Sequence, residues 1–145
     1  MGIMDIINKE KEKDSEKLVN PIKIFDKLTK EEGYGYLRSN QVDFLEKWFN
    51  KRKEENIVGI LNTGAGKTLI GLLMLMSKMN ELGEPVIYLC PDNQLVGQVV
   101  NQAKNYGIQT VKIDNNIIPM EFINSEAILV TTFEKLFNGK SIFGI

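Results

Sequence analysis

The segment LNTGAGKT, residues 61–68, leaves few folds open to this chain. It follows a short apolar run at residues 57–61 and leads into an apolar stretch with helical spacing, from Lys67 to about Asn80. An apolar run, a glycine-rich turn and a helix form the start of a βαβ unit, in which parallel strands alternate with helices. We therefore predict an α/β fold with a parallel sheet flanked by helices.

Later segments continue this alternation. Apolar runs predict strands at residues 86–90, 110–113 and 127–130, and a helix is predicted at residues 93–105, ended by Gly107. In open α/β sheets, ligands collect at the carboxyl ends of the strands. The residues that follow Leu61, Cys90 and Val130 should therefore share one edge of the sheet.

The chain divides into three parts by composition. Residues 1–20 form a charged tail to which we assign no function. Residues 21–54 predict two helices, one opening at Pro21 and running through Leu28, and one capped by Asn40. Residues 55–145 carry the predicted α/β domain.

Composition excludes several kinds of site. The 145 residues contain no histidine and one cysteine, Cys90, which excludes histidine-based triads, the usual zinc ligand sets and a disulfide framework. The net charge of −1 gives no global basic field, so a nucleic acid would have to be held by a local surface. The longest apolar stretch, residues 69–76, is too short to span a bilayer. We expect a cytoplasmic protein with no membrane partner.

The glycine-rich segment matches a phosphate-binding loop in its expected position between strand and helix. Gly64 and Gly66 allow the backbone amides to approach phosphate oxygens, and the start of the helix adds unpaired N–H groups. Lys67 would reach the β and γ phosphates, and the Thr68 hydroxyl would coordinate magnesium. A glycine turn that merely caps a helix is the structural alternative. The predicted ligands of ATP and Mg²⁺ in this segment are Asn62, Thr63, Gly64, Ala65, Gly66, Lys67 and Thr68.

Four segments taken in order carry a family resemblance: LRSNQ at 37–41, LNTGAGKT, CPDNQLVGQ at 90–98 and ILVTTFEKL at 128–136. Over about residues 35–139, the chain resembles the first RecA-like domain of superfamily 2 DEAD/DEAH-type helicases. The resemblance implies a partial RecA-like fold in which Lys67 and Thr68 serve catalysis. It also implies that Arg38 and Gln41 recognise adenine, since an amide can pair with its edge and a guanidinium can stack on its face. The alternative is that both lie on the surface of a capped helix.

The same resemblance implies a nucleic-acid surface. It would grip the sugar-phosphate backbone of DNA or RNA, a contact that carries no sequence information. Asp92 stands where relatives often have threonine, which places a negative charge beside this surface. The implied contact residues are Pro91, Asn93, Gln94, Gln98, Thr131 and Thr132.

Two catalytic parts of such enzymes have no counterpart in these residues. Phosphoryl transfer needs a second carboxylate element and an arginine finger, which the family supplies from a DExx motif and a second RecA-like domain. Asp114 and Glu134 are isolated acids at other places. We expect the N-terminal part of a longer helicase, which binds ATP but is incomplete for hydrolysis alone and has the remaining domains as its partner. Another P-loop NTPase or kinase and a non-catalytic nucleotide-binding module remain alternatives.

Overall fold

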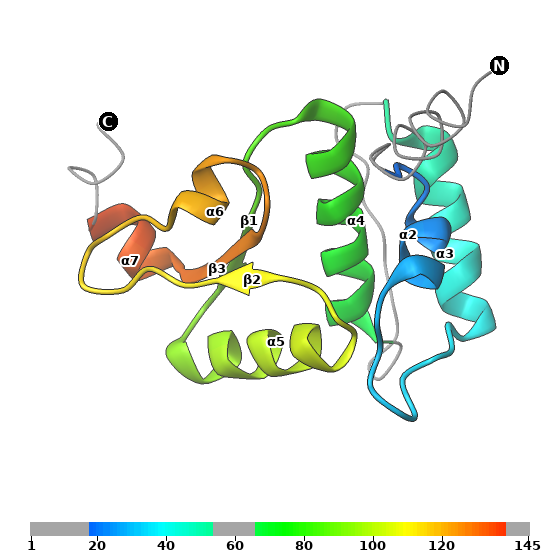
Figure 1. Ribbon diagram of the computed structural model, residues 1–145, viewed down its shortest axis with the longest axis horizontal. Helices are drawn as coiled ribbons and strands as arrows, with labels where there is room; N and C mark the ends of the chain where they lie inside the picture. Colours follow the sequence, from blue (N-terminus) through cyan, green and yellow to red (C-terminus); the bar gives the residue numbers. More distant parts are fainter. Residues whose placement is uncertain (1–17, 54–65, 139–145) are drawn as a thin grey trace, which may run out of the picture.

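The computed structural model describes residues 18–53 and 66–138, which form an α/β arrangement of a small sheet and flanking helices (Figure 1). The predicted strand at residues 57–61, the loop residues Asn62, Thr63, Gly64 and Ala65, and most of the charged tail lie outside the described residues. The elements are α2 (Pro21–Lys27), α3 (Ser39–Lys51), α4 (Lys67–Leu82), β1 (Ile87–Cys90), α5 (Asn93–Asn105), β2 (Thr110–Val111), α6 (Met120–Ile123), β3 (Ile128–Thr132) and α7 (Phe133–Asn138).

The three described strands are parallel and lie in the order β1-β3-β2. Ile87 pairs with Leu129 and Cys90 with Thr132, while Thr110 pairs with Ile128. All five residues of the central strand β3 are buried. The predicted α/β class and parallel sheet are confirmed, and β3 runs two residues further than the pattern predicted.

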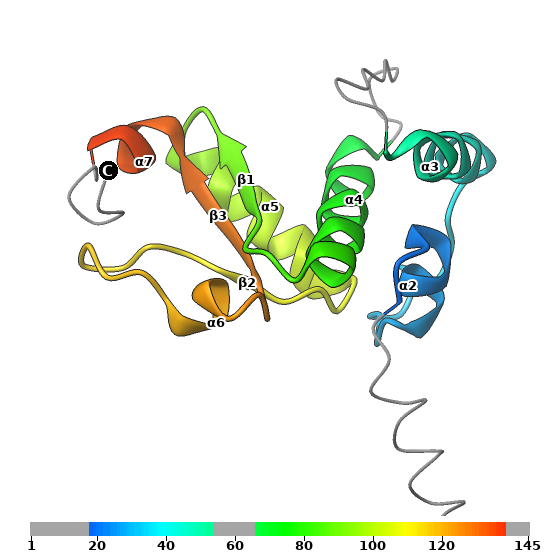
Figure 2. The ribbon, with the colours of Figure 1, turned by 90° about the horizontal axis from the view of Figure 1, so that it is seen from above.

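Helix α4 lies between the sheet and the helix pair α2 and α3, as both ribbon views show (Figures 1 and 2). Its apolar residues face both neighbours: Leu69, Ile70, Leu72 and Leu73 are almost completely buried. They join Ile24, Phe25 and Leu45 of the helix pair and Ile128 and Val130 of the sheet in one core cluster. The prediction that this helix is apolar nearly all round and buried is therefore confirmed.

Two helix ends differ from the sequence prediction. Helix α3 begins at Ser39 with Arg38 in the cap position, so the prediction that Asn40 caps this helix was wrong. The Gln41 Oε1 accepts a hydrogen bond from the Arg38 backbone N–H at 2.9 Å. The side chain that bonds the backbone at the start of this helix is thus Gln41 and not Asn40. Helix α2 ends at Lys27 rather than running through Leu28, because the Lys30 Nζ donates to the carbonyls of Phe25 and Leu28.

The sequence pattern did not predict the shortest elements correctly. Helix α6 is four residues long and follows Pro119 at its cap, too short to show helical periodicity. Strand β2 covers two of the four residues predicted for it. Among residues 18–53 and 66–138, no helix combines the length and the apolar character needed to cross a membrane.

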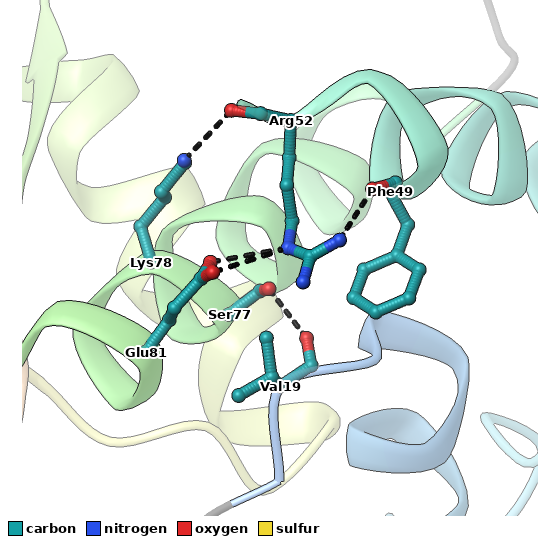
Figure 3. Close-up of polar contacts among 6 residues, drawn as sticks. All are labelled: Val19, Phe49, Arg52, Ser77, Lys78 and Glu81. Carbon is teal, nitrogen blue, oxygen red and sulfur yellow. Dashed lines mark hydrogen bonds and ion pairs between the residues drawn. The ribbon is translucent and has the colours of Figure 1, made fainter. Parts of the chain in front are cut away.

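The C-terminal end of α4 is fastened by polar contacts (Figure 3). The Arg52 Nε donates to both carboxylate oxygens of Glu81 at 3.3 and 3.2 Å, and its Nη1 donates to the Phe49 carbonyl at 2.8 Å. Lys78 Nζ donates to the Arg52 carbonyl at 3.0 Å. We call Arg52, Ser77, Lys78, Asn80 and Glu81 the C-terminal cluster.

This cluster also holds the last residues of the predicted tail. The buried Ser77 hydroxyl donates to the Val19 carbonyl, and the Asn80 Nδ2 donates to the Leu18 carbonyl at 2.7 Å. Residues 18–20 therefore pack on α4 and lead directly into α2, whose first turn is capped by the Asn20 side chain at 3.0 Å from the Ile22 nitrogen.

Candidate functional site

The N-terminal end of α4 begins at Gly66, which has a φ of 71° and so occupies the left-handed region that favours glycine. The Gly66 carbonyl accepts the first helical hydrogen bond, from Ile70 at 3.2 Å. The N–H groups of Lys67, Thr68 and Leu69 lie in the first turn, where no helical partner exists for them. Lys67 is exposed and Thr68 half-buried. This end of α4 therefore presents N–H groups without a partner inside the helix, and the positive end of the helix dipole.

Arg38 and Gln41 pack directly against Gly66. A Cβ placed on Gly66 would collide with the Gln41 amide nitrogen and lie 3.0 Å from a guanidinium nitrogen of Arg38. The two side chains can therefore occupy these positions only because residue 66 is a glycine. Residues 25 positions apart in sequence meet here because Gln41 is buried in the first turn of α3 and faces α4.

The side-chain donors near this end have no partners among the described residues. The Gln41 Oε1 accepts from the Arg38 backbone, and the Gln41 Nε2 makes no hydrogen bond within residues 18–53 and 66–138. Within the part of the chain that the structure describes, neither the Arg38 guanidinium nor the Lys67 ammonium has a hydrogen bond or ion pair. Arg38 and Gln41, from the start of α3, therefore meet Gly66 where Lys67 begins α4.

Arg38 and Gln41 border a pocket of about 390 Å³, which we call the α4 pocket. Arg38, Gln41 and Gly66 form one side of it, and Leu69 contributes an apolar surface. Tyr36, whose side chain is 86% exposed, stands at its rim. Pockets of roughly 300–1,000 Å³ with a few converging polar groups are typical of small-ligand sites.

The opposite side of the α4 pocket comes from the end of α5 and the segment before α3. Gln102, Asn105 and Tyr106 line it together with Tyr34. The Asn105 Nδ2 donates to the Tyr34 hydroxyl at 3.3 Å, and the rings of Tyr34 and Tyr106 meet edge to face with centroids 5.2 Å apart. Burial raises the pKa of Tyr106, the neighbouring Tyr34 raises it further and the nearby Arg38 opposes both.

The C-terminal edge of the sheet carries the residues that we predicted to contact nucleic acid. Pro91, Asn93, Gln94 and Gln98 are all exposed around the start of α5. Asp92, which stood out as an unfavourable charge there, caps α5: its Oδ1 accepts from the Leu95 nitrogen at 2.9 Å.

Thr131 and Thr132 lie at the same edge but point into the protein. They are 2% and 4% exposed. The Thr132 Oγ1 accepts from the Lys135 nitrogen at 3.1 Å and caps the start of α7. The Thr131 Oγ1 is buried without a hydrogen-bond partner among the described residues. In this arrangement only the backbone of the threonine pair could face a ligand.

Within the described residues, the two isolated acids of the sequence analysis lie in other parts of the fold. Asp114 lies in a tight turn closed by its bridge to Ile117, and Glu134 lies in the first turn of α7. No cluster of three or more His, Cys, Asp or Glu side chains able to hold a metal ion occurs in residues 18–53 and 66–138. Thr68 is therefore the metal-ligand candidate within the described part of the site.

Sequence reasoning missed five pocket residues: Tyr34, Tyr36, Gln102, Asn105 and Tyr106. The two tyrosines of the segment before α3 follow Gly33 and Gly35, and this alternation of glycine and aromatic residues was the one local signal. The α5 residues gave none, because only the tertiary fold brings the end of α5 to the start of α4.

Comparison with known proteins agrees with the resemblance seen in the motifs. A family model described as DEAD/DEAH box helicase matches residues 38–141, which is most of the chain. Searches among curated proteins and among solved structures found no match. The match begins at Arg38, at the side of the α4 pocket, and extends past α7.

Proposed function

This chain belongs to the DEAD/DEAH box helicase family, and from that premise we propose that it is the ATP-binding part of a nucleic-acid-dependent ATPase. The observation that carries the proposal is the packing of the Arg38 and Gln41 side chains against Gly66, beside the α4 pocket, at the point where Lys67 begins α4. A ligand with a planar polar base at one end and a polyanion at the other fits this arrangement of groups.

The polyanionic end would lie at the first turn of α4. Lys67 would neutralise the β and γ phosphates, and Thr68 would hold Mg²⁺ through its hydroxyl. Asn62, Thr63, Gly64, Ala65 and Gly66 would add backbone amides. The ion held by Thr68 would supply positive charge that, together with that of Lys67, offsets the charge of the phosphates.

The base would enter the α4 pocket between Arg38 and Gln41. The free Gln41 Nε2 can donate to a ring nitrogen of adenine, and the guanidinium plane of Arg38 can lie against the ring face. The same side chains touch Gly66, so base and phosphates would be held by contiguous groups.

The nucleic-acid surface would run along the C-terminal edge of the sheet. Asn93, Gln94 and Gln98 expose neutral amides that can donate to phosphate and sugar oxygens, and Pro91 shapes the turn before them. Backbone amides after Thr131 and Thr132 would provide a second grip. DNA and RNA offer the same phosphates, so this surface suits either.

We further propose that these residues supply only part of the hydrolytic site. Neither Asp114 nor Glu134 lines the α4 pocket. The carboxylate that orients the attacking water and the arginine finger would come from other parts of the enzyme. The 145-residue chain should therefore bind ATP but hydrolyse it poorly, and nucleic acid should not stimulate its turnover. Stimulated turnover by the purified chain would contradict this part of the proposal.

The central test is calorimetric titration of the chain with Mg·ATP. A hydrogen bond to a charged group contributes about 1.5–3 kcal/mol, so Lys67→Ala should weaken ATP binding by roughly tenfold to a hundredfold. Lys112→Ala, which removes an exposed lysine outside the pocket, is the matched control and should bind as the parent does. Equal affinity of the Lys67→Ala and Lys112→Ala variants would refute the assignment.

A further inference from the structure

The loop between α2 and α3 is fastened to the end of α5 by a set of contacts with no evident part in the phosphate site. Asn105, the last residue of α5, makes two of them. Its carbonyl accepts the Glu31 N–H at 2.8 Å, and its side chain bonds the Tyr34 hydroxyl at 3.3 Å. One residue therefore holds the loop at two points three residues apart.

Neighbouring side chains complete this attachment. The Tyr34 ring meets Tyr106 edge to face, and Tyr106 in turn packs on Phe25 of α2 with ring centroids 6.0 Å apart. Gly107 has a φ of 75°, and a Cβ there would collide with the Thr29 carbonyl. The chain after α5 thus lies in direct contact with the start of the loop.

The loop ends at Arg38, which caps α3 and borders the α4 pocket. Three residues separate Tyr34 from Arg38, and both Gly33, with a φ of 89°, and Gly35 lie in open space. Without its attachment at Tyr34, this glycine-containing segment would have many conformations available. The position of Arg38 over the pocket therefore depends on where Tyr34 is held.

We propose that Asn105 is a positioning residue for the base-binding side of the α4 pocket, acting through the Tyr34 hydroxyl. The inference rests on the proposed ATP site and adds a residue outside the motifs that define it. Asn105 fixes Tyr34, and Tyr34 fixes the segment that delivers Arg38. Removing the Asn105 side chain leaves the phosphate end of the site unchanged, because Lys67 and Thr68 belong to α4 and make no contact with the loop through this bond.

The test compares two ligands that share the phosphates and differ in the base. ATP and inorganic tripolyphosphate are titrated into the chain in the presence of Mg²⁺, and the ratio of their dissociation constants measures the contribution of the base. A hydrogen bond of about 0.5–1.5 kcal/mol predicts that Asn105→Leu weakens ATP binding by roughly twofold to twelvefold. Tripolyphosphate affinity should not change.

A double-mutant cycle identifies the route of the effect. Tyr34→Phe keeps the ring contact with Tyr106 and removes the hydroxyl, so it should reproduce the loss. Asn105→Leu should cost nothing further in the Tyr34→Phe background, because both changes remove the same bond. Asn101→Leu, an exposed position one turn earlier on α5, is the control and should leave both ligands unaffected.

The outcomes separate this inference from the proposed function. If the parent chain binds neither ligand, the ATP site itself is refuted. If the parent prefers ATP and the ratio is the same in Asn105→Leu, the positioning role alone is refuted. Additive losses from Asn105→Leu and Tyr34→Phe would also overturn it, since Asn105 would then act on the ligand directly. Should Asn105→Leu fail to fold, the smaller Tyr34→Phe change decides through the same ratio.

Discussion

The two ends of α4 use similar polar side chains in opposite ways. At the C-terminal cluster, Arg52 and Lys78 donate to groups within the protein, and Ser77 and Asn80 do the same. At the other end, Arg38 and Lys67 make no hydrogen bond or ion pair through their side chains among the described residues. Among the described residues, the cations at the C-terminal cluster are therefore paired and those at the start of α4 are not, as the proposed ATP site requires.

Both ends share the buried middle of α4, which makes the contrast testable. Polar contacts at the C-terminal cluster should affect the free energy of unfolding and leave ligand affinity unchanged. Changes to the groups at the start of α4 should lower ligand affinity and leave the free energy of unfolding unchanged, because we propose that these groups bind a ligand. The following variants are ordered by the size of the effect that this contrast predicts.

The largest effect should come from Leu73→Ala, which removes a fully buried side chain midway between the two ends. Leucine-to-alanine changes in cores cost about 2–5 kcal/mol, a large share of the stability of a small domain. Urea unfolding followed by circular dichroism should show this loss. Leu82→Ala, the same change at a 57% exposed position of the same helix, is the control. A comparable loss in both variants would mean that the middle of α4 is not the shared core.

Gly66→Ala should separate the two ends most sharply. Left-handed backbone costs an alanine about 1–2 kcal/mol, and the new methyl group would also displace Gln41 and Arg38. We expect ATP affinity to fall by at least about tenfold, or ~1.4 kcal/mol, in calorimetry.

The control for that variant is Gly83→Ala at the far end of α4. Gly83 has a φ of 66°, but a Cβ there meets nothing within 4 Å. The Gly83→Ala variant should therefore lose a similar amount of folding free energy from backbone strain and keep its affinity for ATP. Loss of ATP binding in Gly83→Ala would show that affinity follows stability and not the contacts at Gly66.

The sequence predicted the elements that have clear periodicity. The apolar spacing of α4 and α5 and the apolar runs of β1 and β3 gave their positions to within two residues, because burial of one face imposes a repeat. The α/β class followed from their alternation. Helix α6 and the end of α2 could not be predicted from periodicity. Helix α6 depends on its proline cap, and the end of α2 depends on the contacts of Lys30 with two carbonyls.

The candidate site was predictable only in part for a related reason. Arg38, Gln41 and Gly66 belong to local motifs, and the structure brings them together. Asn105 and Tyr34 lie 71 residues apart and meet through the packing of α5 against the loop before α3. Such a contact has no local signature. Conversely, the sequence suggested that the charge of Asp92 would be unfavourable beside a nucleic acid. In the structure its carboxylate caps the start of α5, a role that involves no ligand.

Replacing each of the two arginines by methionine, in separate variants, tests the contrast directly. Arg52→Met would leave Glu81 and the Phe49 carbonyl without their donor, and about 1–2 kcal/mol of stability should be lost, a modest value because both side chains are 21% exposed. ATP affinity should not change. Arg38→Met should retain stability and weaken ATP binding. Equal behaviour of the two variants in unfolding and in calorimetry would remove the distinction between the ends.

The smallest effect should come from Ser77→Ala, which removes the hydroxyl that holds the Val19 carbonyl. Because Val19 is half-buried, water can replace part of this bond, and we expect a loss of about 0.5–1.5 kcal/mol. Hydrogen exchange should be faster in the peptide that covers residues 18–27, since this contact anchors the entry into α2. Ser39→Ala, at an exposed position in the first turn of α3, should leave that exchange unchanged. Unaltered exchange in Ser77→Ala would mean that the Asn80 bond to Leu18 suffices to fasten this end of α4.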